Sequence, residues 1–233
     1  MISRTDGVRS SIRDFRWDAS VNKRTGLAQS IETSYSTPFA SRNISFHITS
    51  LKNAFENYPN FLGLNNIVPG VRVMYSNCDE KGSMLTRSYV RDVVFGVKLL
   101  EFGTPKSTLQ KSKGLQTYLP IMGGFLVQKP FEKREGIQKK KKKKIKNFGY
   151  LEFTATCEND KNDPSNHTWM ITTQIIDYPP RIAGPAPVCS IRKELYLKSQ
   201  SILHAYVMRR FHSYCHKVII KYKEKNENHV ETI

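Results

Sequence analysis

The stretch SILHAYVMRRFHSYCHKV, residues 201–218, decides the fold. Its large apolar residues recur at steps of four, four, three and four: Leu203, Val207, Phe211, Tyr214 and Val218. Apolar residues at this spacing form one stripe along an α-helix, as expected of a helix that packs on a sheet. Because neither glycine nor proline interrupts the region, the spacing predicts one continuous helix over residues 193–222.

The chain before this helix reads as a series of antiparallel strands joined by short turns. The predicted strands are rich in β-branched and aromatic residues, and several alternate apolar with polar side chains. They cover residues 71–76, 84–94, 97–102, 115–122, 150–157 and 168–176. The turn Asp79-Glu-Lys-Gly82 joins the first two as a hairpin, and a proline-rich segment at 179–187 crosses from the last strand to the helix.

The beginning of the chain carries two further expectations. Ile44, Phe46 and Ile48 alternate with polar residues, which predicts a half-buried first strand. Two short helices follow it, one from Ser50 as N-cap to Pro59 and a second over 61–66. We therefore expect an α+β protein, with an antiparallel sheet and a long C-terminal helix.

Several stretches are similar to one known superfamily. They are Pro69-Gly-Val-Arg-Val-Met-Tyr75, the Gly82 hairpin, Arg87 to Glu101 with the following Gly-Thr-Pro bend, and Gly149-Tyr-Leu-Glu-Phe153 with the Trp169 strand. Together with the order of elements, they resemble the helix-grip fold of the START-related (SRPBCC) superfamily, over roughly residues 42–222. That superfamily includes polyketide cyclases and dehydrases, lipid-transfer domains and coenzyme Q-binding proteins. The resemblance implies a curved sheet wrapped on the long helix, with a hydrophobic small molecule or lipid in the cavity between them.

The resemblance also divides the chain into segments. Residues 1–40 show no periodicity and are rich in Ser, Thr and Arg, so we expect a flexible basic arm. We expect residues 41–222 to form the ligand-binding domain, with 128–148 as a lysine-rich insertion, and residues 223–233 to form a frayed tail. The insertion, the arm and the long proline-rich crossing depart from the pattern of the superfamily.

Candidate cavity residues are large side chains at inward-facing positions near polar groups, although such residues more often pack in a core than bind a ligand. They are Phe46, Tyr75, Tyr89, Leu99, Tyr118, Phe153, Trp169, Ile171, Tyr206 and Phe211.

Polar candidates lie on neighbouring predicted strands. Arg87, Arg91 and Glu101 could orient a carboxylate, hydroxyl or carbonyl of a ligand, whereas the cost of burying charge favours a cross-strand ion pair on the solvent face. His47 lies out of phase with the apolar face of its predicted strand, so we expect it to face solvent.

No catalytic motif or metal site is predicted. His212 and His216 have the i, i+4 spacing of a zinc pair, but the sequence offers no third ligand. Nucleophile elbows and phosphate-binding loops are absent, so we expect no cofactor and favour a non-enzymatic role.

The formal charge of +17 is partly concentrated in one segment. Residues 132–146 hold nine basic and two acidic residues, and the run Lys139, Lys140, Lys141, Lys142, Lys143, Lys144 lies within them. Such a run is most simply a solvated, self-repelling loop. As a contact surface it favours an anionic membrane over nucleic acid, because no aromatic residues are interleaved for base stacking.

Four separated cysteines without a secretory segment indicate reduced thiols in an intracellular protein, and no apolar run is long enough for a membrane span. We expect a cytoplasmic location. Mitochondrial import is the alternative, because arginines and serines are frequent near the N-terminus, although Asp6, Asp14 and Asp18 argue against it.

Three functions remain open from the sequence. The leading hypothesis is a noncatalytic carrier or sensor of a hydrophobic small molecule or lipid. The second is a cyclase or dehydrase type of enzyme, with Glu101 or Tyr89 as general acid or base. The third is a basic accessory protein of an RNA or ribosomal assembly.

Overall fold

The computed structural model describes residues 12–40, 44–64, 67, 68, 70–77, 86–92, 95–110, 114–128, 148–159 and 166–227. Its strands are β1 (Ile12–Val21), β2 (Ala28–Ser36), β3 (Phe39–Ala40), β4 (Val71–Asn77), β5 (Thr86–Asp92), β6 (Lys98–Phe102), β7 (Lys106–Gln110), β8 (Gly114–Gly123), β9 (Tyr150–Asn159) and β10 (Asn166–Tyr178). Its helices are α1 (Ile44–Glu56), α2 (Tyr58–Leu64), the short 3-10 helix η1 (Arg181–Ala183), α3 (Ser190–Lys198) and α4 (Gln200–Glu227).

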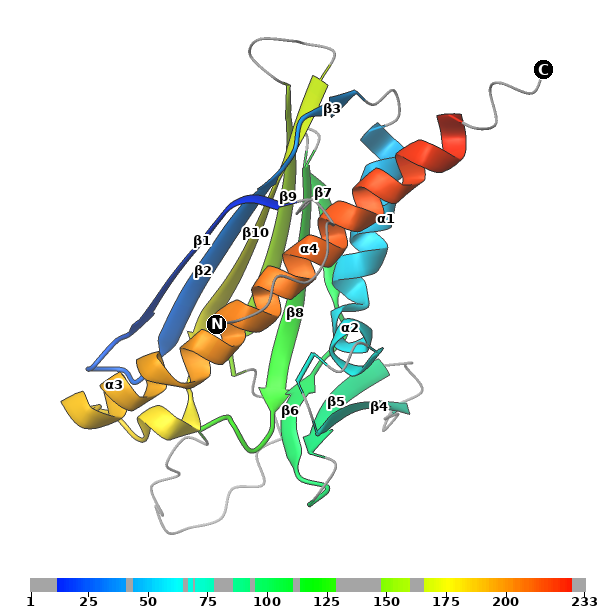
Figure 1. Cartoon of the computed structure of the whole chain (residues 1–233). Helices are drawn as coiled ribbons and strands as arrows, with labels where there is room; N and C mark the ends of the chain where they lie inside the picture. The colour runs from blue at the N-terminus through cyan, green and yellow to red at the C-terminus, as the bar shows by residue number, and fades with distance from the viewer. Residues whose placement is uncertain are drawn as a thin grey trace, which may run out of the picture.

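The strands form one antiparallel sheet that holds α4 against one face (Figure 1). The strand order is β1-β2-β10-β9-β8-β6-β5-β4, and β3 pairs with β10. Helix α4 crosses the sheet diagonally and contacts β1, β2, β10 and α1 (Figure 1). The α+β helix-grip fold expected from the sequence is confirmed.

Strand β8 changes partners along its length. Its first half pairs with β7, from Leu115 opposite Leu109 to Tyr118 opposite Lys106. Its second half pairs with β6, where Ile121 lies opposite Phe102. The segment 103–105 between β6 and β7 is the predicted break, and β7 is a strand that the sequence analysis did not predict.

The prediction of a flexible arm over residues 1–40 is wrong for its described part. Residues 12–36 form the β1-β2 hairpin, and β2 lies beside the long strand β10. The pattern of β2 hid this strand, because the face that packs inward is polar. Ser30, Glu32, Ser34 and Ser36 are buried, whereas Ile31 is 42% exposed.

Residues 44–49 form the start of α1, so the prediction of a strand with Ile44, Phe46 and Ile48 on its buried face is wrong. Ile44 and Ile48 pack on the core together with Leu51 and Phe55, a helical spacing that the alternation of the first residues concealed. His47 lies on the same face and is buried, so the expectation that it faces solvent is wrong. Burial lowers its pKa, and the neighbouring His167 lowers it further.

The C-terminal helix differs from the prediction in continuity and in phase. It is broken at Ser199, which has φ −125° and ψ −79°, between α3 and α4. Two of the predicted stripe residues, Leu203 and Tyr214, are about half exposed, whereas Met208 and Cys215 are fully buried. Helix α4 continues to Glu227, so the frayed tail does not begin at residue 223.

Aromatic rings fill the core between the helices and the sheet. The ring of Phe211 on α4 lies 4.9 Å from that of Tyr58, 5.0 Å from that of Phe61 and 5.4 Å from that of Phe153 on β9, measured between centroids. Phe55 stacks on Phe153 at 5.4 Å. This cluster fixes α1 and α2 beside α4, and the cavity begins at its edge.

Candidate ligand cavity

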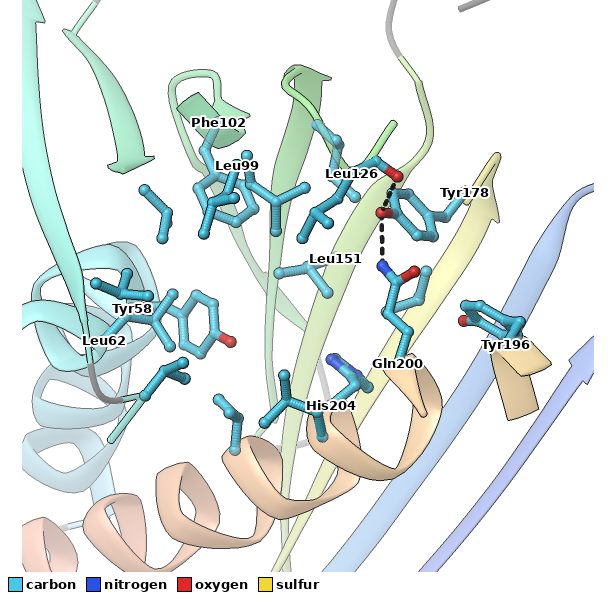
Figure 2. A pocket seen from close by; sticks show the side chains of 18 residues that line it. Tyr58, Leu62, Leu99, Phe102, Leu126, Leu151, Tyr178, Tyr196, Gln200 and His204 are labelled. Carbon is cyan, nitrogen blue, oxygen red and sulfur yellow. Dashed lines mark hydrogen bonds between the residues drawn. The ribbon is translucent and has the colours of Figure 1, made fainter. Parts of the chain in front are cut away.

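A cavity of about 160 Å³ lies between the first turns of α4, helix α2 and the strands β5, β6, β8, β9 and β10 (Figure 2). Its wall is mainly aliphatic. The apolar wall residues are Leu62, Val68, Val71, Val90, Leu99, Leu100, Phe102, Ile121, Leu126, Leu151, Ile175, Leu203 and Val207. Leu203 is 49% exposed, so this part of the wall also borders solvent.

Tyr58, Tyr178, Tyr196, Gln200 and His204 add polar groups to this wall (Figure 2). The hydroxyl of Tyr178 donates to the carbonyl oxygen of Leu126 at 2.9 Å, and Nε2 of Gln200 donates to the Tyr178 oxygen at 2.9 Å. The first bond ties the end of β10 to the segment after β8, and the second ties the start of α4 to the end of β10.

The tyrosine hydroxyls of the wall are held in their protonated form. Burial raises the pKa of Tyr58 and of Tyr196, and in both cases the nearby Glu32 carboxylate raises the pKa further. Burial also raises the pKa of Tyr178, partly offset by its bond from Gln200. The phenols therefore act as neutral hydrogen-bonding groups at physiological pH.

Glu32 and His204 meet at the edge of the cavity. Oε1 of Glu32 lies 3.3 Å from Nε2 of His204, and the side chains are 0% and 15% exposed. The two atoms are close enough for an ion pair but are not aligned as a hydrogen bond, and among the described residues neither Glu32 oxygen has a hydrogen-bond partner. A carboxyl group buried in this way is costly unless it is neutral or paired.

A second polar cluster lies further along α4. Ser34 Oγ on β2 is 2.9 Å from Nδ1 of His212 and 2.9 Å from Nε2 of His216, and Thr173 Oγ1 on β10 is 2.8 Å from Nε2 of His212. Burial lowers the pKa of His212 to about 3, helped by His216 and His204, and lowers that of His216 to about 4. Both imidazoles are neutral links between helix and sheet.

This cluster is not a metal centre within the described part of the chain. No group of three or more His, Cys, Asp or Glu side chains comes together there to hold a metal ion. Both ring nitrogens of His212 and Nε2 of His216 hydrogen-bond to hydroxyl groups instead.

The ten sequence candidates for the cavity have different locations. Leu99 lies in the wall. Phe153, Trp169, Ile171 and Phe211 are fully buried in the core beside it, and Phe46, Tyr75 and Tyr206 are exposed. Tyr118 is half-buried and packs edge-on against the Tyr150 ring at 5.5 Å.

The remaining candidates are placed only by strand register. Tyr89 lies opposite Glu101, Arg87 opposite Ser76, and Arg91 opposite Arg72. The side chains of Tyr89, Arg87 and Arg91 lie outside the described residues. Glu101 is half-buried on β6 and is not among the described residues of the wall. The lysine run 139–144 also lies outside the described residues.

Sequence reasoning missed Tyr58, Gln200, His204 and Glu32. One signal was present, because His204, His212 and His216 are separated by multiples of four and share one helix face. A second was the alternation of polar residues in β2, which marks a strand if its polar face is taken as the buried one.

Comparison with known proteins gives no family. Neither the protein-family models nor the curated proteins match this chain. Among solved structures, a protein from Arthrobacter aurescens is similar at a TM-score of 0.38 and 10% identity, over 82% of this chain and 86% of that chain. The Zhui aromatase/cyclase from Streptomyces sp. R1128 is similar at 0.36 and 10% identity, over 81% and 93%.

Ara h 8.0201 is similar at a TM-score of 0.26 and 14% identity, over 76% of this chain and 95% of that chain. At such scores these likenesses carry no argument about function. No helix within the described residues combines the length and apolar character needed to cross a bilayer.

Proposed function

We propose that this protein binds a hydrophobic small molecule in the cavity beneath the start of α4, as a noncatalytic carrier or sensor. The observation that carries the proposal is the cavity itself, a space of about 160 Å³ with aliphatic walls and a few polar groups along one side. Concave apolar sites with a small number of directed polar groups are the usual form of small-molecule sites.

The volume favours a ligand about the size of one ring. An apolar cavity of about 150 Å³ stays dry and holds benzene. A lipid tail or a quinone with an isoprenoid chain requires more space, so its binding would require α4 or the β4-β5-β6 edge to move outward. A single aromatic or alicyclic ring fits without that movement.

Calorimetric titration with toluene tests the proposal. We expect saturable binding by the wild-type protein and at least a tenfold loss, about 1.4 kcal/mol, when Val207→Phe fills the cavity from α4. Val97→Phe is the matched control, because Val97 is exposed and lies outside the described wall. If toluene binds equally well to both variants, or does not bind the wild-type protein, the proposed function is wrong.

An acid–base enzyme in the same cavity is the second candidate, and the Glu32–His204 contact favours it. His204 could remove a proton from the carbon next to a carbonyl, with the charge of the imidazolium balanced by Glu32, and solvent could return a proton to that carbon. This role replaces the one first assigned to Glu101 or Tyr89. Deuterium uptake from solvent into cyclohexanone that is faster than in buffer, and that is abolished in His204→Leu, would support the enzyme. Uptake no faster than in buffer would exclude this activity on cyclohexanone.

The lysine run remains a proposed contact with an anionic membrane. Each lysine near such a surface contributes about 1 kcal/mol, and salt weakens this attraction. Deleting residues 138–146 should abolish association with phosphatidylserine vesicles and leave toluene binding unchanged. Tight binding of RNA at moderate salt, without vesicle binding, would instead support the role in an RNA assembly.

A further inference from the structure

The position of Glu32 explains what kind of polar group the cavity can accept. Its side chain is fully buried on β2, and its Oε1 lies 3.3 Å from Nε2 of His204. The two atoms are not aligned as a hydrogen bond, but the negative charge of a carboxylate 3.3 Å away stabilises the N–H form of the nitrogen that faces it. Glu32 therefore favours a proton on Nε2 of His204.

The proton on Nε2 determines the behaviour of the other ring nitrogen. In a neutral imidazole, one nitrogen donates and the other accepts, and the partner of one nitrogen sets the role of the other. With its proton on Nε2, His204 presents Nδ1 as an acceptor. The ring is part of the cavity wall, and Figure 2 shows it on the same side as Gln200, one helical turn away.

The other polar groups at this end are a bonded pair, Tyr178 with Gln200, and two phenol hydroxyls that can both donate and accept. Tyr178 donates to Leu126 and accepts from Gln200. Tyr58 and Tyr196 are held protonated by burial and by Glu32. An acceptor at Nδ1 of His204 adds a contact by which the cavity distinguishes a ligand with a hydroxyl from an apolar ligand of the same size.

We propose that the Glu32–His204 pair makes the cavity selective for a one-ring ligand that carries a hydrogen-bond donor, such as a phenolic hydroxyl. His204 contacts the ligand, and Glu32 acts as a positioning residue that fixes the tautomer of His204. This inference rests on the proposed function, because it concerns the same cavity. It goes further in naming the chemical class of the ligand.

Phenol and toluene are the probes that test the inference, because they share a ring and differ in one hydroxyl or methyl group. The dissociation constants of both are measured for the wild-type protein and for His204→Leu. Removing the hydroxyl from water has the same cost in both proteins, so the ratio of the two constants isolates the contact with His204. We expect the ratio to shift against phenol by about fivefold in the variant, since a buried neutral hydrogen bond contributes about 1 kcal/mol.

Benzaldehyde, which only accepts hydrogen bonds, is the third probe. The inference is overturned if the ratio of the phenol and toluene dissociation constants is unchanged in His204→Leu. It is also overturned if the variant loses affinity for benzaldehyde instead of phenol. In both cases, toluene binding by the wild-type protein still upholds the proposed function. Failure of all three ligands to bind the wild-type protein overturns both. Retained toluene binding by His204→Leu shows that the variant is folded.

Glu32→Gln tests the positioning role separately. In protein labelled with nitrogen-15 in histidine, the signals of His204 are identified by their loss in His204→Leu. We expect Nδ1 of the wild-type ring to resonate as an unprotonated nitrogen and the tautomer to become mixed in Glu32→Gln. Unchanged signals, or a wild-type ring protonated on Nδ1, would overturn the role of Glu32.

Discussion

Ser34 Oγ on β2 lies 2.9 Å from Nδ1 of His212 on α4, so a buried hydrogen bond joins the sheet to the helix that it grips. The same oxygen lies 2.9 Å from Nε2 of His216. One hydroxyl thus hydrogen-bonds to two imidazoles. The contact also places β2, and with it Glu32, in register with α4.

Loss of this hydroxyl should destabilise the protein. Ser34→Ala leaves two buried ring nitrogens without their partner, and a buried unsatisfied group costs about 1–3 kcal/mol. Because two such groups lose their partner, we expect urea denaturation to give a free energy of unfolding at least about 2 kcal/mol lower. Ser30→Ala is the control, because Ser30 is buried on the same face of β2 but its Oγ has no partner among the described residues. Equal effects of the two substitutions would contradict the importance of the Ser34 contacts.

Stability should fall as the pH is lowered from about 6.5 towards 4. In the unfolded chain a histidine takes up its proton near pH 6.5, whereas the native pKa is about 3 for His212 and about 4 for His216. Between these values the unfolded state binds more protons, so acid favours unfolding, by up to about 1.4 kcal/mol per pH unit for each histidine. Urea denaturation at pH 7 and pH 5 measures the slope.

The double variant His212→Gln, His216→Gln is the comparison for this slope. It removes both titrating groups while keeping polar side chains opposite Ser34, so its stability should depend less on pH over the same interval. An equally steep dependence in this variant would assign the effect to other groups.

The aromatic cluster should contribute more to stability than the exposed face of α4. Phe211→Ala should lower the free energy of unfolding by about 3–5 kcal/mol, since it opens a cavity among Phe55, Tyr58, Phe61 and Phe153. Tyr206→Ala, at a position that is 48% exposed on the same helix, should have an effect below about 1 kcal/mol. If thermal denaturation shows that both variants lose comparable stability, the face of α4 that packs on the core has been assigned wrongly.

Gly149, just before β9, should not tolerate a side chain. Its φ is +85°, and a Cβ atom would collide with the carbonyl oxygen of Ile176 on β10. Gly149→Ala should therefore be more destabilising than Gly96→Ala by at least about 1 kcal/mol, the lower end of the cost of overpacking. Gly96 also has a positive φ, but a Cβ there meets nothing within 4 Å, so the difference isolates the collision. Equal melting temperatures would contradict the close approach.

The strands from β4 to β10, apart from β7, could be predicted because each carries a local signal. In β9 and β10 the inward residues are mostly apolar and alternate with exposed or half-exposed ones, and turn-forming residues separate the strands. The same rule failed for β2, where Ser30, Glu32 and Ser34 face the core and Ile31 faces solvent. A strand with a buried polar face can be recognised only with its partners, here His212 and His216, in place.

The cavity was harder to predict than the sheet for a physical reason. Strand alternation tells which side chains point inward, but not which of them meet a neighbour and which meet empty space. Phe153 and Leu99 were therefore equal candidates, although one is packed under Phe55 and the other faces the cavity. The break at Ser199 and the phase of α4 decide this difference, and both depend on tertiary contacts.

The most direct test of the account is a crystal structure of the protein soaked with bromobenzene, located by the anomalous signal of its bromine. We predict one site beneath the start of α4, between Val207 and Leu151, with the ring surrounded by the aliphatic wall. No bromine in the cavity at saturating concentration, or bromine only at surface positions, would contradict the claim that this cavity binds small apolar molecules.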